Sequence, residues 1–165
     1  MKDYKKTIGK FERDYDKKTV RTLNDLKDSY YDKESVRNIL NTKGNIELYK
    51  VFIRDFSPID LGLTVVKSGK IGKEFYFTKG HIHKNREPEF YILLDGIGEL
   101  FLQKGKKSKT IKLKRGEISL IPVGWAHRLI NIGSNKLKVL TIYHQNSKPD
   151  YSVIFKKRFF GKWKR

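Results

Sequence analysis

From residue 46 onward, apolar residues alternate with polar ones along short runs, and turn-forming residues interrupt these runs at close intervals. Tyr49, Val51 and Ile53 would share one face of a first strand, because successive side chains of a strand point to opposite faces. Turn signals such as Ser68-Gly69 and Asp95-Gly96 separate the runs. The expected strands cover residues 49–53, 61–66, 75–78, 89–94, 99–103, 110–113, 118–121, 128–132 and 136–143. So many short strands predict an all-β fold, either a sandwich or a small barrel.

The first 45 residues are polar and carry little strand signal, so we expect a short, partly helical N-terminal arm. Leu23 and Leu26 are three residues apart, which suits one helical turn. Asp32 is placed to cap a helix whose apolar residues Val36, Ile39 and Leu40 follow at helical spacing. The length of 165 residues fits a single domain.

We divide this expected domain into an arm over residues 1–45, a β-barrel over 46–155 and a basic aromatic tail over 156–165. The tail combines aromatic rings with several lysines and arginines. We expect its rings to pack on the barrel while its charges remain in water. A tail that touches a membrane or RNA is the alternative.

The chain is strongly basic, with 37 Lys and Arg against 18 Asp and Glu and a formal charge of +19. Such a charge attracts anions, among them nucleic acid or a phosphorylated metabolite. The lysines are scattered along the chain, and no nucleic-acid-binding motif accompanies them. We therefore do not expect a nucleic-acid partner, although a nucleic-acid-binding protein driven by this charge remains an alternative to be tested.

Several classes of protein are excluded by what the sequence lacks. With no cysteine, the chain has no disulfide framework, no thiolate nucleophile and no cysteine-type zinc site. No stretch approaches the roughly 18 uninterrupted apolar residues that a membrane span requires, so a membrane partner is not expected. The first residues lack the apolar segment of a secretory signal, so we expect a cytoplasmic protein.

Three of the four histidines and one glutamate form a candidate metal site. His81 and His83 are two residues apart, so on an extended strand their rings point to the same face. Glu89 follows after a polar turn, and His127 lies on a later predicted strand. Three imidazoles and one carboxylate suit Fe²⁺, Mn²⁺, Ni²⁺ or Zn²⁺, and an octahedral ion would keep two positions open. Two open positions are what a hydroxy-carbonyl substrate needs in order to chelate the ion.

The segment around His127 resembles the second motif of the cupin superfamily. Gly116, Pro122, Gly124, His127 and Asn131 occur at each fixed position of that motif. This resemblance implies a cupin-type small β-barrel, or jelly roll, with a metal centre.

The segment around His81 resembles the first cupin motif through His81, His83, Glu89 and Gly96. It departs from the motif in two ways. The leading glycine of the motif falls at Phe75, and the interval between His83 and Glu89 is one residue longer than usual.

A narrower resemblance covers residues 19–151, which is most of the chain. The stretch from Gly72 to His83, with its Thr78-Lys79-Gly80-His81 run, is similar to the signature of the archaeal-type (cupin) glucose-6-phosphate isomerases. Further matches to that family lie at residues 20–23, 48–51, 89–91, 96–98, 125–128 and 131–133.

This resemblance implies a metal-dependent aldose–ketose isomerase that interconverts glucose 6-phosphate and fructose 6-phosphate, and it suggests a homodimer. The family's metal ligands fall on His81, His83, Glu89 and His127. Iron is the expected ion, with manganese, nickel or zinc as alternatives. The family's phosphate and sugar contacts fall on Tyr49, Thr64, Thr78, Gly80, Tyr91 and Tyr151, with Lys79 beside them.

The expected chemistry moves hydrogen between C1 and C2 of the open-chain sugar. Glu89 is the candidate base for a cis-enediol route, and Tyr91 would orient the substrate. A hydride shift, in which the metal acts only as a Lewis acid, is the alternative route.

One departure from the family keeps other functions open. Pro149 precedes Asp150-Tyr151, where the family often has a histidine, and the nearby His144 has no assigned role. The alternatives are a phosphosugar-binding cupin without turnover and an isomerase for a related sugar such as mannose 6-phosphate.

Overall fold

The computed structural model describes residues 9–85, 87–153 and 155, and it confirms an all-β protein with a small helical arm. The helical elements are α2 (Leu23–Leu26), a 3₁₀ helix η1 (Lys27–Ser29) and α3 (Lys33–Lys43). The strands are β1 (Lys17–Thr22), β2 (Glu47–Phe56), β3 (Ile59–Val66), β4 (Lys70–Ile71), β5 (Glu74–Phe75), β6 (Ile82–His83), β7 (Glu89–Asp95), β8 (Gly98–Lys104), β9 (Lys107–Lys112), β10 (Ile118–Ile121), β11 (Ala126–Asn131), β12 (Leu137–His144) and β13 (Pro149–Asp150).

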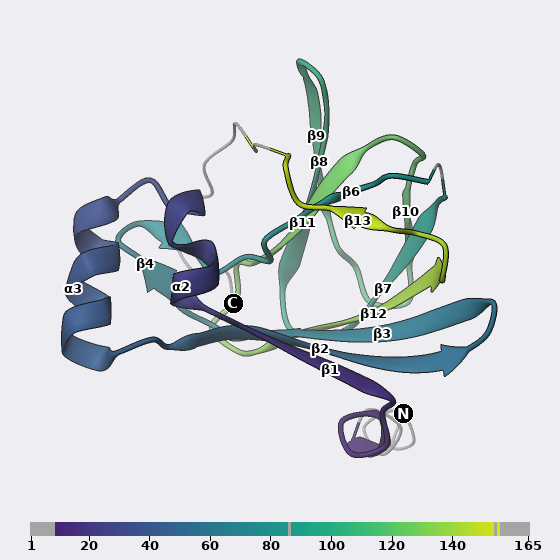
Figure 1. The fold of residues 1–165 in the computed structure, drawn as a ribbon, viewed down its shortest axis with the longest axis horizontal. Coiled ribbons are helices and arrows are strands. Elements are labelled where there is room, and N and C mark those ends of the chain that lie inside the picture. The colour runs from purple at the N-terminus through teal and green to yellow at the C-terminus, as the bar shows by residue number, and fades with distance from the viewer. Residues whose placement is uncertain (1–8, 86, 154, 156–165) are drawn as a thin grey trace.

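The strands form two opposed layers. The larger sheet has six antiparallel strands in the order β1-β2-β3-β12-β7-β10, and the smaller has the order β11-β8-β9. Two short ribbons, β13-β6 and β4-β5, complete the structure. Figure 1 shows the small sheet and the β13-β6 ribbon facing the long strands β1, β2 and β3 across the molecule. Because β12 lies between β3 and β7, two strand groups far apart in sequence become one sheet.

Alternation along β2 places its side chains on two faces, as the sequence predicts. Tyr49, Val51 and Ile53 point into the cavity between the layers. Leu48 and Phe52, at the intervening positions, are buried elsewhere. The pairing of β2 with β3 is regular, and Val51 lies opposite Thr64, which also lines the cavity.

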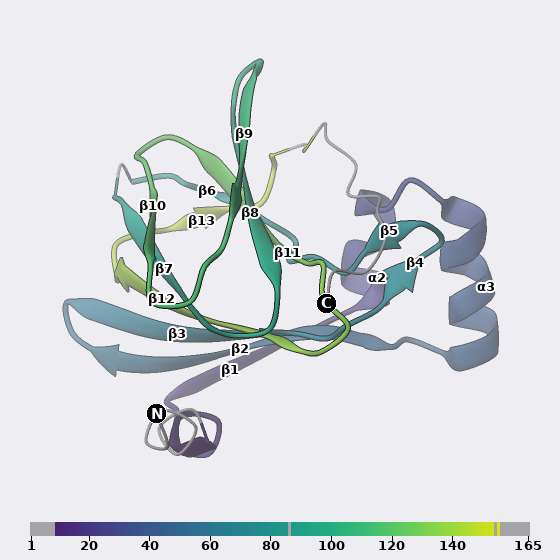
Figure 2. The same ribbon diagram turned by 180° about the vertical axis from the view of Figure 1, so that it is seen from behind.

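The N-terminal arm is part of the folded domain. Leu23 and Leu26 of the short α2 helix are almost fully buried, and the Tyr30 ring stacks on Phe77 with centroids 4.4 Å apart. The Asp32 side chain caps α3 by accepting a hydrogen bond from the Ser35 N–H at 2.9 Å. Both predicted helical segments are therefore confirmed, and Figure 2 shows α2 and α3 beside the β4-β5 ribbon.

The arm also contains a strand that the sequence analysis did not predict. Residues Lys17–Thr22 form β1, an edge strand that pairs with β2, so the expectation of little strand structure before residue 46 was wrong. The pattern Lys-Lys-Thr-Val-Arg-Thr has a single large apolar residue, Val20. Its extended form comes from hydrogen bonding to β2, and a local pattern does not show such pairing.

The strand predicted over residues 75–78 is much shorter than expected. Only Glu74–Phe75 form a strand, and Phe77 makes an isolated bridge to Ile130. The reason is that the amides of Tyr76 and Thr78 bond to different segments: the Tyr76 N–H donates to the Gly69 carbonyl, and the Thr78 N–H donates to the Leu129 carbonyl. No continuous ladder results. The predicted tail over residues 156–165 lies outside the described residues.

None of the described helices has the length and apolar character needed to cross a membrane.

Candidate metal centre

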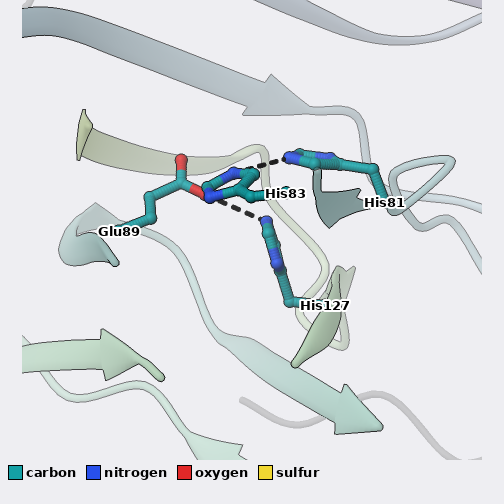
Figure 3. A group of neighbouring side chains, drawn as sticks. All are labelled: His81, His83, Glu89 and His127. Atoms are coloured by element: carbon teal, nitrogen blue, oxygen red, sulfur yellow. Dashed lines mark hydrogen bonds and ion pairs between the residues drawn. The ribbon is translucent and has the colours of Figure 1, made fainter. Parts of the chain in front are cut away.

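Four side chains from three separate stretches of the chain converge inside the cavity. His83 lies on β6, Glu89 begins β7 and His127 lies on β11. His81 is held beside His127 by two backbone hydrogen bonds, of 2.9 and 3.2 Å, between these two residues. Figure 3 shows the four side chains pointing toward one another, and their ligand atoms all lie within 4.8 Å of each other. The predicted ligand set is therefore brought together.

The closest approaches within the cluster involve the Nε2 atoms of the histidines. His127 Nε2 lies 2.9 Å from Glu89 Oε2, and His83 Nε2 lies 3.4 Å from the same oxygen. His81 Nε2 and His83 Nε2 are 3.1 Å apart. The outer nitrogen of His83, Nδ1, lies 3.0 Å from the Glu87 carbonyl oxygen. A proton on that Nδ1 leaves the Nε2 lone pair directed at the cluster, as in metal-binding histidines.

The electrostatics of Glu89 and His81 favour the protonation states that bind a metal. Burial raises the pKa of Glu89, but the facing imidazoles of His127 and His83 outweigh burial and bring this pKa to about 2. Burial and the neighbouring His127 lower the pKa of His81 to about 3. Glu89 is therefore ionised and His81 neutral at physiological pH, and both states are required of metal ligands. For His83, burial lowers the pKa, but hydrogen bonding to Glu89 and to the Glu87 carbonyl outweighs burial and raises this pKa above its ordinary value.

Two buried atoms test whether these residues fit a metal ion. Glu89 Oε2 and His127 Nε2 are buried, and neither makes a well-oriented hydrogen bond to another described residue. The two atoms lie 2.9 Å apart without a hydrogen bond between them, and a metal ion bound by both would give each buried atom a partner. Nitrogen and oxygen donors of this kind suit Fe²⁺, Mn²⁺, Ni²⁺ or Zn²⁺, and the residues present fit such an ion.

The cluster forms part of the wall of a cavity of about 320 Å³. All the residues predicted to contact substrate also line it except Lys79, whose Nζ lies 5.4 Å from the centroid of the Tyr151 ring. The predicted residues in the lining are Tyr49, Thr64, Thr78, Gly80, Tyr91 and Tyr151. Their placement is compatible with a substrate site, and their contact with substrate stays a prediction.

Hydrogen bonds fix the Thr78–His81 segment against its neighbours. The Thr78 hydroxyl accepts a hydrogen bond from the Leu129 N–H at 3.0 Å, and the Tyr49 hydroxyl accepts one from the Lys79 N–H at 3.2 Å. Arg128, buried between the rings of Phe77 and Phe155, donates to the Lys79 carbonyl at 2.7 Å. This segment carries the candidate ligand His81, so its anchoring also orients the candidate metal cluster.

Sequence reasoning missed several residues of the cavity. Those with polar or aromatic side chains are Thr19, Arg21, Asp60, Thr141, Tyr143, Gln145 and Ser147. Thr19 and Arg21 belong to the unpredicted strand β1, two residues apart and on one face. Tyr143 and Thr141 have the same period-two relation on β12, which is the signal that would have identified them.

His144 and Pro149, whose roles the sequence analysis did not assign, have different positions: His144 ends β12 and Pro149 begins β13. His144 Nδ1 accepts a hydrogen bond from the Asn146 N–H at 3.1 Å, and His144 is absent from the cavity lining. Pro149 lines the cavity and pairs with His83. The position where the family often has histidine thus faces the site with a side chain that carries no titratable group.

The fold and the four converging side chains together define a cupin with a candidate metal centre. Solved structures share the fold. An oxalate oxidase structure matches with a TM-score of 0.53 and 18% identity, covering 63% of this chain and 55% of that one. The oxalate decarboxylase of Bacillus subtilis matches with a TM-score of 0.52 and 22% identity, covering 62% of this chain and 27% of that one. At these identities the likeness shows the fold alone.

The sequence comparisons are more specific. A model of the family described as glucose-6-phosphate isomerase (GPI) matches residues 20–161. The glucose-6-phosphate isomerase of Pyrococcus horikoshii is 35% identical over 149 residues, which cover 87% of this chain and 78% of that protein. The chain belongs to the glucose-6-phosphate isomerase family, which confirms the resemblance found in its motifs.

Proposed function

We propose that this protein is a metal-dependent isomerase that interconverts glucose 6-phosphate and fructose 6-phosphate. The convergence of His81, His83, Glu89 and His127 on one wall of a cavity carries this proposal. Family membership supports the substrate, because the relatives are named glucose-6-phosphate isomerases. The homodimer and the cytoplasmic location expected from the sequence belong to the same proposal.

The four cluster residues would hold one divalent ion per chain, with iron as the expected metal and manganese, nickel or zinc as alternatives. A bound ion would supply a Lewis acid beside the carbonyl group of the sugar. Tyr91 lies two residues after Glu89 on β7, so both side chains face the cavity. Tyr91 would orient the open-chain sugar in the cavity.

Two routes are compatible with this arrangement. In the cis-enediol route, the Glu89 carboxylate takes a proton from C2 of glucose 6-phosphate and returns it to C1, while the hydroxyl proton on O2 passes to O1. In the hydride-shift route, the hydrogen passes directly between C1 and C2, and Glu89 acts only as a ligand. Isomerisation in deuterated water separates the two, because a proton held on Glu89 exchanges with solvent and a shifted hydride does not.

Metal removal tests the proposed activity. Treatment with EDTA should abolish conversion of glucose 6-phosphate to fructose 6-phosphate, because the four ligands would lose the ion that they are arranged to hold. Adding Fe²⁺, Mn²⁺, Ni²⁺ or Zn²⁺ back separately should restore activity and identify the preferred metal. Full activity in a rigorously metal-free sample would refute metal dependence.

A panel of substrates tests the substrate assignment. The same reconstituted protein should turn over glucose 6-phosphate faster than mannose 6-phosphate and unphosphorylated glucose. A preference for mannose 6-phosphate would reassign the substrate. Tight binding of these phosphosugars without turnover would instead favour a non-catalytic binding cupin, an alternative that Pro149 in the cavity wall keeps open.

A further inference from the structure

We propose that Arg21 is the residue that selects a phosphorylated substrate, by binding the phosphate group through its guanidinium. This inference rests on the proposed isomerase function and adds a residue of the N-terminal arm to its site. Arg21 lies on β1 on the same face as Thr19, and both line the cavity. Its side chain is about one-third exposed, so it lies at the edge of the cavity within reach of an incoming ligand.

The groups around Arg21 make one end of the cavity suited to an anion. The Arg21 guanidinium lies near the Tyr49 hydroxyl, and this hydroxyl accepts a hydrogen bond from the Lys79 N–H at 3.2 Å. The Arg21 guanidinium lies 6.0 Å from the centroid of the Tyr151 ring, and Lys79 Nζ lies 5.4 Å from it. Two cations therefore lie beside one aromatic ring, and the Tyr49 hydroxyl lies near one of them.

The same ring connects this cationic end to the metal cluster. The ring centroids of Tyr151 and His81 are 5.6 Å apart. An elongated ligand can therefore place an anionic group beside Arg21 while its opposite end reaches the cluster. A sugar phosphate with its carbonyl group far from its phosphate has this shape.

The charge of Arg21 is only weakly neutralised within the protein. Among the described residues, the acid paired with Arg21 is Asp25, whose Oδ1 lies 3.9 Å from Arg21 Nη1. The other oxygen of Asp25 accepts hydrogen bonds from the Thr22 N–H at 2.7 Å and from the Thr22 hydroxyl at 2.8 Å. Asp25 is absent from the cavity lining. The planar guanidinium therefore keeps donors for a bidentate contact with phosphate.

Besides Glu89 of the metal cluster, the acidic residue that lines the cavity is Asp60, and Asp60 is remote from Arg21. Asp60, on β3, accepts a hydrogen bond from Gln145 at 3.0 Å. Arg21 pairs with Tyr49, and Tyr49 pairs with Val66, which is six residues along β3 from Asp60. Along the strands this separation is about 20 Å. The cavity is thus cationic at one end and acidic at the other, and a phosphate group is favoured at the Arg21 end.

Steady-state kinetics of Arg21→Met test the assignment. The variant should raise KM for glucose 6-phosphate by roughly tenfold or more, because a charge-assisted hydrogen bond to phosphate is lost, while kcat changes by less than about threefold. Arg21→Lys, which keeps the charge but not the planar fork, should give an intermediate KM. The matched control is Arg37→Met, which removes the same charge from an exposed position on α3 and should leave both constants unchanged.

Direct binding of inorganic phosphate separates this inference from the isomerase proposal. Calorimetry on the metal-loaded protein should show binding to the parent and to Arg37→Met, and affinity roughly tenfold or more lower for Arg21→Met. If the parent binds phosphate in this Arg21-dependent way but isomerises no sugar, the proposed function fails and the phosphate site stands. If Arg21→Met keeps the parent's KM and phosphate affinity, the assignment is wrong. Should Arg21→Met fail to fold, unchanged KM and affinity in Arg21→Lys would overturn it instead.

Discussion

His127 and His83 both face the Glu89 carboxylate, and His127 is the most buried of these three side chains, with 1% of its side chain exposed. Its backbone bridges His81, and its Nε2 faces Glu89 Oε2. Removing this ring takes away one of the proposed metal ligands and leaves a buried carboxylate beside a void. Both effects act on the same ion-binding point.

We therefore expect His127→Ala to lower metal affinity by more than the roughly 10–100-fold that loss of an outer-shell partner costs, and to abolish turnover. Metal content per chain and isomerase rate measure the two effects. The matched control is His144→Ala, since His144 bonds to the Asn146 amide and lies outside the cluster. Full metal occupancy in His127→Ala would remove this residue from the ligand set.

The metal cluster was predictable from sequence because its residues lie in recognisable patterns. His81 and His83 share a strand face by spacing alone, whereas His127 was linked to them only through a cupin motif. Arg21 was missed because its role depends on which strands pair, and β1 meets β2 across more than twenty residues of chain. Local spacing carries no information about that pairing.

At the scale of elements, two kinds of contact hold the N-terminal arm on the rest of the domain: packing into the main core and a hydrogen bond to β5. Leu23 and Leu26 of α2 are buried in the main core, and Glu74 on β5 accepts a hydrogen bond from the Tyr31 N–H at 2.6 Å. These contacts place β1, and with it Thr19 and Arg21, beside the cavity. The arm is therefore structural support for the site.

Leu26→Ala should lower the free energy of unfolding by about 2–5 kcal/mol, because it leaves a cavity under the arm. Leu120→Ala, which removes the same atoms from a leucine that is 48% exposed on β10, should change it by less than about 0.5 kcal/mol. Denaturant unfolding of both variants measures the difference. Equal, small effects would mean that the arm contributes little to the stability of the domain.

At the scale of the whole molecule, the charge of +19 exceeds what one phosphate site requires. Lys104, Lys106, Lys107 and Lys109 lie in the β8–β9 hairpin and the turn that joins its strands, which projects from the body in Figure 1. These cations add to a positive potential around the molecule. Such a potential raises the rate at which anions arrive, and salt weakens it.

Accordingly, kcat/KM for glucose 6-phosphate should fall roughly three- to tenfold as ionic strength rises from about 0.01 to 0.2 M, since the Debye length shortens from about 30 to under 10 Å. Sucrose at matched osmolality should have little effect. A flat salt profile would mean that the overall charge does not assist substrate capture. Fluorescence polarisation with duplex DNA, over the same salt series, tests the alternative that the charge serves nucleic acid.

The position of β12 in the large sheet has a consequence for synthesis of the protein. β12 lies between β3 and β7 in the sheet and pairs with both, yet the ribosome synthesises it after both of them. A nascent chain that has emerged from the ribosome only to residue 136 has two unjoined strand groups, each with an open edge. Long-range closure of this kind is slow and leaves the edges open to wrong partners. The protein should therefore acquire its metal only after residue 144 has emerged from the ribosome.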